Sequence, residues 1–263
     1  MATAIEQEIY SLTKNELRAL ALSISPVQLA LTLGISPDPW QKEILLSEEK
    51  RVILNCSRQS GKSTIAAILA IHHALNDPGS LVLVLSPSLR QSGELFKKVM
   101  GFYKDLGKPI ESEIEQALTL QLANKSRIVS LPGKEQTIRG FSGVSLLIVD
   151  EAARVDDALY YSIRPMLAVS QGRMILLSTP FGKRGFFHHT WTQEEDWIKI
   201  KITAYECPRI SKEFLEEEEA TLGEWWFRQE YCAEFSENVD AYFSNDEIQN
   251  SISDEVKPLF GEL

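Results

Sequence analysis

The sequence has little of three things that would direct it to particular function classes: cysteine, long apolar runs and positive charge. It contains three cysteines, Cys56, Cys207 and Cys232, and their wide separation excludes the paired spacing of a zinc site or a disulfide framework. The longest apolar runs, such as LVLVL and MILLS, are far too short to span a bilayer, and the N-terminus lacks the basic segment of a signal peptide. We therefore expect a protein of a reducing compartment, with no membrane partner and no zinc.

The net charge of −10 would argue against a nucleic-acid partner if it were spread evenly along the chain, but it is not. Residues 205–263 carry 16 acidic side chains against 4 basic ones, whereas residues 1–204 carry 21 against 23. A basic surface on the first part is therefore compatible with the composition. With 263 residues, 44% of them hydrophobic, the chain has room for one large domain, with or without a small appendage.

The most informative segment is CSRQSGKS, residues 56–63, which lies between the apolar run RVILN and the helical pattern STIAAILAIHHALN. Strand, loop and helix in this order are the context of a phosphate-binding loop, whose backbone N–H groups and helix N-terminus bind anions. In such a loop Lys62 reaches the β- and γ-phosphates and Ser63 holds Mg²⁺. Cys56 stands where the usual pattern has glycine, so only the GKS half is standard. The alternative is an ordinary helix N-terminus with Ser60 as its cap.

An acidic pair ends a second apolar strand, SLLIVDEA. Adjacent acids at the carboxyl end of a buried strand lie where open α/β sheets bind their ligands. Beside a phosphate loop, we expect Asp150 to bind the Mg²⁺ hydration shell and Glu151 to polarise an attacking water. The pair therefore indicates hydrolysis rather than binding alone. Without the loop, two solvated acids at a strand end would be the better interpretation.

Strand and helix patterns alternate along the chain, which predicts an α/β fold with a mostly parallel sheet flanked by helices. The expected strands are RVILN, LVLVL, SLLIV, RMILLS and WIKIKIT, with an antiparallel hairpin at LTLQLANKSRIVSL. The expected helices cover residues 63–76, 89–103 and 156–167. Residues 1–34 read as two helical stretches, and PDPWQKEIL as a turn leading into a helix. Gln41 in that helix either reads an adenine base or lies on the helix surface.

The C-terminal part has a different, acidic and helical pattern, which predicts a small helical subdomain over residues 205–237. In KEFLEEEEATLGEWWFRQEYCAEF the EEEE run is interpreted as a solvated helix face. The side chains expected to be buried are aromatic: Trp225, Trp226, Phe227, Tyr231 and Phe235. Residues 238–263 are expected to form a weakly structured connector.

Taken together, these motifs closely resemble the ATPase domain of the large terminase subunit of tailed bacteriophages over essentially the whole chain. The resemblance rests on SRQSGKS after a glutamine-bearing helix, TIRGFSG ahead of LLIVDEA, and ILLSTPFGKRG after it. It implies a P-loop NTPase fold of the RecA or ASCE type, using ATP and Mg²⁺. Its ATPase core with an N-terminal helical extension would occupy residues 1–204, a lid subdomain 205–237, and a linker towards an absent nuclease domain 238–263.

The resemblance also assigns roles residue by residue. It makes Arg58 a sensor of the phosphates, and Arg139 an arginine that reaches a neighbouring subunit's nucleotide, although an ordinary surface or salt-bridge arginine is the alternative. STP resembles a motif that couples hydrolysis to lid movement; alone it would read as a strand ending in a turn. The coupling residues are Ser178, Thr179 and Pro180. The expected nucleotide contacts are Gln41, Ser57, Arg58, Gln59, Ser60, Gly61, Lys62, Ser63, Thr64 and Asp150, with Ser63 and Asp150 at the metal and Lys62, Arg58, Glu151 and Arg139 in catalysis.

As partners the resemblance implies double-stranded DNA, a portal protein, a small terminase subunit and a ring of commonly five subunits in the host cytoplasm. The isolated domain can nevertheless be monomeric. We expect no nuclease activity, because about 25 residues follow the lid and a domain needs roughly 100. A superfamily 2 helicase shares several motifs but requires a second ATPase-like domain, and only 60 residues follow WIKIKIT. A small-molecule kinase and a nucleotide-gated assembly switch stay open as alternatives.

Overall fold

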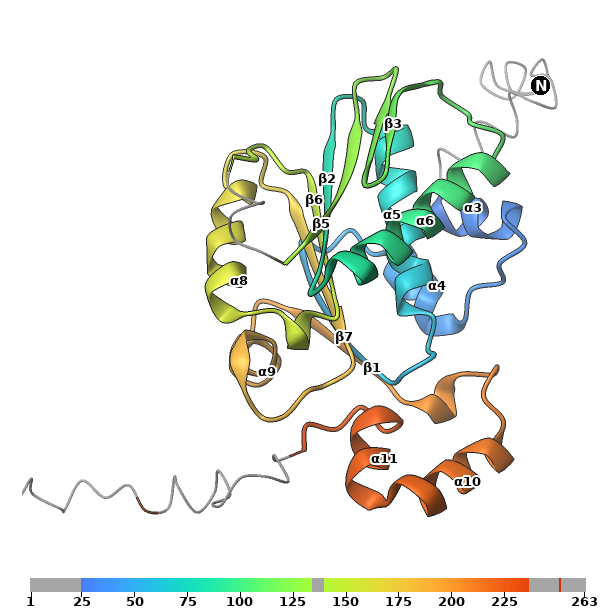
Figure 1. Ribbon diagram of the computed structural model, residues 1–263, viewed down its shortest axis with the longest axis vertical. Helices are drawn as coiled ribbons and strands as arrows, with labels where there is room; N and C mark the ends of the chain where they lie inside the picture. The colour runs from blue at the N-terminus through green and yellow to red at the C-terminus, as the bar shows by residue number, and fades with distance from the viewer. Residues whose placement is uncertain (1–24, 134–139, 237–250, 252–263) are drawn as a thin grey trace, which may run out of the picture.

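A single eight-stranded sheet forms the centre of the protein, whose computed structural model describes residues 25–133, 140–236 and 251 (Figure 1). Six neighbouring strands are parallel: β5 (Arg127–Pro132), β2 (Leu81–Ser86), β6 (Leu146–Asp150), β7 (Arg173–Ser178), β1 (Arg51–Cys56) and β8 (Ile198–Ile202). At the β5 side, β4 (Thr119–Leu122) and β3 (Ser112–Gln116) pair antiparallel. The predicted mostly parallel α/β fold and its hairpin are confirmed; β3 was not predicted.

Helices cover both faces of the sheet, because successive strand residues point to opposite sides and both sides are apolar. Val52 and Leu54 belong to the core under one helical layer, whereas Ile53 between them belongs to the other. The first layer consists of α3 (Pro26–Thr32), α4 (Pro39–Leu46), α5 (Lys62–Asn76) and α6 (Leu89–Asp105). The second consists of α8 (Asp157–Ile163) and α9 (Gly185–Gln193), on the opposite side in Figure 1.

The helix predictions for residues 63–76 and 89–103 are confirmed by α5 and α6. The helix expected over 156–167 is divided, since α8 gives way to the 3₁₀ turn η2 (Arg164–Leu167). Pro165 lacks the N–H that would continue the α-helix. Helix α9 was not predicted, because GFFHHTWTQ carries no clear apolar period.

Residues 204–230 form a small helical layer below the sheet in Figure 1, with η3 (Ala204–Glu206), α10 (Lys212–Leu222) and α11 (Glu224–Glu230). Gly223, at φ 76°, separates the two helices in a conformation that favours glycine. Phe227 and Tyr231 pack into a core of their own, as expected. Trp226 is 48% exposed, so its predicted burial is wrong: a helix of two turns buries only one face. We call this layer the lid.

Two predictions fall largely outside the described residues: the first N-terminal helical stretch and the connector at 238–263. Within the part that the structure describes, no helix is both long and apolar enough to cross a membrane.

Candidate phosphate-binding site

Three sequence motifs meet at the carboxyl edge of the sheet because of the strand order. β7 lies between β6 and β1, and all three strands are parallel. The register sets Asn55 beside Ser178 and Asp150 beside Leu177, so all three strands end at the same level. The loop after β1, the acidic pair at the end of β6 and the STP motif at the end of β7 therefore face one another, as expected where α/β sheets bind ligands.

The loop between β1 and α5 presents a row of backbone donors. The N–H of Ser57 donates to the carbonyl of Ile202 and that of Arg58 to the carbonyl of Glu230. Among the described residues we find no acceptor for the next five N–H groups, those of residues 59–63. Buried or clustered donors without partners are costly unless a ligand or water satisfies them, so this loop and the N-terminus of α5 form a candidate anion site.

Gly61 makes this loop possible. Its φ of 92° lies in the left-handed region, and a Cβ there would stand 2.8 Å from Nε2 of Gln41. Gln59 also has a left-handed φ, 59°, which a side chain rarely adopts outside functional loops. The N-cap of α5 is Gly61 and no side chain caps the helix, so the alternative interpretation of Ser60 as an ordinary cap is wrong.

Cys56 explains why the loop departs from the standard pattern. It is the last residue of β1 and is fully buried, and it has no left-handed φ that would require glycine. Burial raises the pKa of its thiol to about 12, so the side chain stays neutral and packs in the core. The position belongs to the strand rather than to the anion-binding turn.

A cavity of about 410 Å³ opens in front of the loop. It is lined by Arg58, Gln59, Gly61, Lys62, Ser63, Thr64, Lys98, Glu151 and Arg209. Four cationic side chains and one carboxylate lie in this lining, and the excess of positive charge persists when Glu230 and Asp38, the partners of Arg58 and Arg209, are counted. This excess favours a polyanionic ligand. Lys98 from α6 and Arg209 from the segment before α10 were not predicted, because neither belongs to a local motif. Lys98 donates through Nζ to Oγ1 of Thr64 at 3.2 Å.

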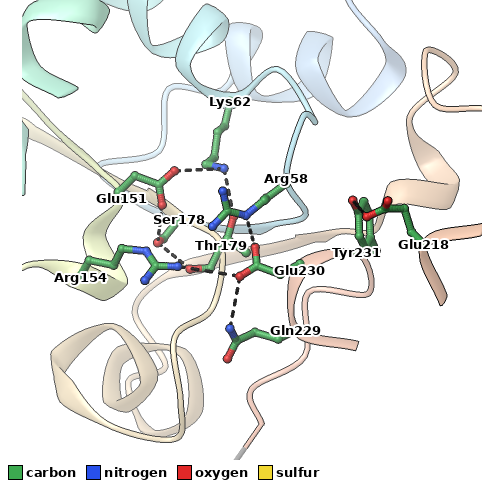
Figure 2. A network of polar contacts seen from close by, with 10 residues as sticks. All are labelled: Arg58, Lys62, Glu151, Arg154, Ser178, Thr179, Glu218, Gln229, Glu230 and Tyr231. Carbon is green, nitrogen blue, oxygen red and sulfur yellow. Dashed lines mark hydrogen bonds and ion pairs between the residues drawn. The ribbon is translucent and has the colours of Figure 1, made fainter. Parts of the chain in front are cut away.

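Lys62 is held between two of the motifs (Figure 2). Its Nζ donates to Oγ1 of Thr179 at 3.1 Å and lies 3.3 Å from Oε1 of Glu151. Glu151 has a left-handed φ of 52°, which turns the chain sharply after β6, and Oγ of Ser178 is 3.5 Å from its Oε2. Lys62 is 7% exposed, so in this arrangement the cation and Glu151 compensate each other in a largely buried place.

Asp150 is the most buried carboxylate of the site, at 5% exposure. It accepts hydrogen bonds from Oγ of Ser63 at 3.2 Å and from the N–H of Glu151 at 3.1 Å. Burial, followed by the nearby charge of Glu151, raises its pKa to about 6. A hydroxyl and a carboxylate beside a phosphate site are the hard oxygen donors that Mg²⁺ takes, so these two residues fit that ion. The described residues contain no cluster of three or more His, Cys, Asp or Glu that could hold a metal.

The raised pKa of Asp150 predicts a stability effect. Its unfolded value is near 3.8, so between about pH 4 and 6 the folded protein binds more protons than the unfolded chain. Stability from this group is therefore lost as the pH rises through that window. We therefore expect the difference in free energy of unfolding between Asp150→Asn and wild type, measured by urea titration, to shift in favour of the variant as the pH rises from 4 to 7. Asp105→Asn, at an exposed position of α6, is measured alongside as the control, and an equal trend in both variants would contradict the assignment.

Arg58 connects the loop to the lid (Figure 2). Its Nε donates to Oε2 of Glu230, a lid carboxylate that is only 7% exposed. The other oxygen of Glu230 is 3.9 Å from Nη2 of Arg154, whose guanidinium lies over the ring of Phe181 at 4.2 Å. Glu230 thus joins the phosphate loop to the segments that follow β6 and β7. The sequence carried no signal for it beyond an acidic helix.

Gln41 is neither on the helix surface nor in the lining of the cavity. It is 4% exposed, so the surface alternative is wrong. Its Oε1 accepts from the N–H of Asp38 at 2.9 Å, and its Nε2 donates to the carbonyl of Ser60 at 3.2 Å. Both ends of the amide are used within the protein, where they brace the start of α4 against the loop. Arg139 lies outside the described residues.

The comparisons with known proteins agree with one another. Residues 53–250 match the family described as "Terminase large subunit, T4likevirus-type, N-terminal". The terminase large subunit of Escherichia phage T5 is 30% identical over 214 residues, which are 77% of this chain and 49% of that protein. That of Thermus phage G20c is 25% identical over 248 residues, 81% of this chain and 51% of that protein. The chain thus spans about half the length of the curated relatives it matches.

Solved structures show the same fold. The large terminase ATPase domain of Thermus phage P74-26 superposes with a TM-score of 0.70 at 24% identity, over 78% of this chain and 96% of that one. The large terminase of bacteriophage D6E, solved in complex with ADP, has a TM-score of 0.58 at 13% identity, over 86% of this chain and 54% of that one.

Proposed function

Because the chain belongs to the T4likevirus-type terminase large subunit family, we propose that it is the ATP-hydrolysing motor domain of a viral DNA-packaging enzyme. The observation that carries the proposal is the row of five N–H groups at residues 59–63 without an acceptor among the described residues, beside Glu151 in the same cavity and Asp150, which is bonded to Ser63. A relative of the same fold has been solved with ADP. The triphosphate of ATP is the polyanion that such a loop takes.

In the proposed complex the β- and γ-phosphates lie along the loop and receive its N–H groups. Lys62 exchanges its ion pair with Glu151 for the phosphates, and this exchange frees the carboxylate. Arg58 and Lys98, which line the same cavity, add positive charge around the triphosphate. Each of these contacts is a charge-assisted hydrogen bond, the strong kind in proteins.

Ser63 and Asp150 would hold Mg²⁺ through their hydroxyl and carboxylate oxygens, and Mg²⁺ bound there would neutralise charge on the phosphate oxygens. Glu151, once released by Lys62, accepts a hydrogen bond from the attacking water and polarises it towards the γ-phosphate. Ser178 contacts Glu151 and Thr179 contacts Lys62, so the contacts of the STP motif change when Lys62 and Glu151 change partners. Glu230 of the lid bonds to Arg58 of the loop, so a movement of Arg58 towards the phosphates also changes the contacts of the lid.

The proposal extends to the assembled motor. We assign double-stranded DNA as its cargo, and the portal protein, the small terminase subunit and further copies of the chain, commonly five in a ring, as its partners in the host cytoplasm. Arg139 would act on the nucleotide of a neighbouring subunit, where an arginine neutralises charge on the transferred phosphoryl group.

Phosphate release is the experiment that tests this function. We expect the purified chain to release phosphate from ATP only when Mg²⁺ is present, and double-stranded DNA to raise the rate when subunits assemble on it. Excess chelator should abolish the reaction. Turnover that survives the chelator would contradict the metal assignment.

The same measurement separates the alternatives. A small-molecule kinase would release little phosphate until its acceptor is added, and an assembly switch would bind ATP with almost no turnover in any condition. A superfamily 2 helicase would respond to single-stranded nucleic acid in preference to a duplex.

A further inference from the structure

Arg209 forms part of the cavity wall and is fixed there by three hydrogen bonds. Its Nη1 and Nη2 donate to the two carboxylate oxygens of Asp38 at 2.9 and 2.8 Å. Nη2 also donates to the carbonyl of Ser60 at 3.0 Å. Asp38 is only 7% exposed, whereas the side chain of Arg209 is 49% exposed. Buried acceptors therefore fix the guanidinium on one side, and its exposed part lines the cavity.

The pairing with Asp38 decides what kind of ligand group Arg209 can bind. A bidentate carboxylate compensates the charge of the guanidinium, so the pair adds little net positive charge for a phosphate. Three of the five N–H donors are already used, two by the carboxylate of Asp38 and one by the carbonyl of Ser60. Two N–H donors and the flat face of this rigid, delocalised cation stay available, and the face is the part that stacks on aromatic rings.

The position of Arg209 matches this chemistry. The side of the cavity where phosphates bind is marked by Lys62, Ser63 and Glu151. Arg209 belongs to the side built by Asp38 and Gln41, where a Cβ on residue 61 would lie 3.5 Å from Nη2 of Arg209 and 2.8 Å from Nε2 of Gln41. Gln41 supports this wall but is buried behind it.

We propose that Arg209 is the residue on which the base of the nucleotide stacks, and that Gln41 braces the wall that holds it. The inference rests on the proposed function, because it takes the ligand of the cavity to be a nucleotide. It assigns base binding to a side chain of the segment that leads into α10. A bound nucleotide would therefore contact the phosphate loop through its phosphates and the lid through its base.

The test compares two ligands that share their phosphates but not the base. Affinities of the full chain for Mg²⁺-ATP and for Mg²⁺-tripolyphosphate are measured by calorimetry in wild type, Arg209→Ala and Arg209→Lys. We expect both substitutions to lower the affinity for ATP roughly tenfold, the scale of one base stacked on a side chain. Lysine at position 209 should not restore the affinity for ATP, because an ammonium group has no flat face. The affinity for tripolyphosphate should stay within twofold of wild type.

Arg228→Ala is the matched control, since Arg228 is a lid arginine of similar exposure, 54%, that pairs with Glu224 and Glu234 away from the cavity. It should leave both affinities unchanged. Equal losses for both ligands in the Arg209 variants would overturn the proposal and make Arg209 a phosphate ligand or a brace of the loop. Full rescue by lysine, or no change at all, would also overturn it. A wild-type chain that binds tripolyphosphate but gains nothing from the base would reject base stacking alone, whereas failure to bind either ligand would reject the proposed function itself.

Discussion

Lys62→Ala should lower the affinity of the chain for ATP by about two orders of magnitude. The ammonium group of Lys62 is buried at the edge of the cavity and is the cation nearest to Glu151. Its loss removes charge-assisted hydrogen bonds to the phosphates, worth about 1.5–3 kcal/mol each. It also leaves the Glu151 carboxylate uncompensated beside the incoming phosphates. The two effects add, and equilibrium titration with a fluorescent ATP analogue measures their sum.

The matched control is Lys97→Ala on α6. Lys97 is exposed, pairs with Glu94 and is not among the residues that line the cavity in front of the loop. It should bind the analogue as wild type does, and thermal denaturation should show that both variants are folded. Wild-type affinity in Lys62→Ala would mean that the loop does not hold the triphosphate, whatever else the cavity binds.

The centre of this site could be predicted from the sequence because it is built from local signals and one topological rule. The loop at residues 56–63 can be recognised from the strand pattern before it and the helix pattern after it. Asp150 and Ser178 end apolar strands, and the carboxyl ends of parallel strands share one edge of a sheet. That rule places the three motifs at one edge of the sheet, and the strand order, with β7 between β6 and β1, makes them neighbours.

The walls of the site could not be predicted, because they depend on how distant segments pack. Arg209 and Asp38 are 171 positions apart in the sequence, and Arg58 and Glu230 are 172 apart. Neither acidic residue differs by pattern from the many surface acids of the chain. Gln41 shows the same limit: its place before the loop was informative, yet only the fold reveals that its amide bonds to Asp38 and Ser60.

The lid shows that an aromatic pattern does not predict burial reliably in a short helix. Five aromatic side chains were expected to be buried, yet Trp226 is exposed and Phe235 packs near Phe187 of the main core instead of within the lid. The turn at Gly223 sets the direction of α11, and α11 has only seven residues with which to cover a small core. The small core of the lid has room for Phe227 and Tyr231, which are buried in it.

Glu151→Gln should have the opposite profile to Lys62→Ala: turnover is lost and binding is kept. An amide cannot accept the proton of the attacking water as a carboxylate does, and groups in this role contribute about 10²–10⁴-fold to the rate. Only the transition state uses that contribution, so it appears in kcat and not in the affinity for ATP.

The ion pair predicts one further detail of this variant. Nζ of Lys62 lies 3.3 Å from Oε1 of Glu151, and ATP must break that pair before Lys62 can turn to the phosphates. Glutamine removes the competing charge and also the repulsion between a carboxylate and the γ-phosphate. Glu151→Gln should therefore bind ATP severalfold more tightly than wild type while releasing phosphate about a thousandfold more slowly. Titration and phosphate release on the same preparation measure both, with Glu217→Gln on the exposed face of α10 as the unaffected control. Near-normal turnover in Glu151→Gln would remove Glu151 from the chemistry, and weaker binding of ATP would show that its pair with Lys62 prepares the site instead of competing for it.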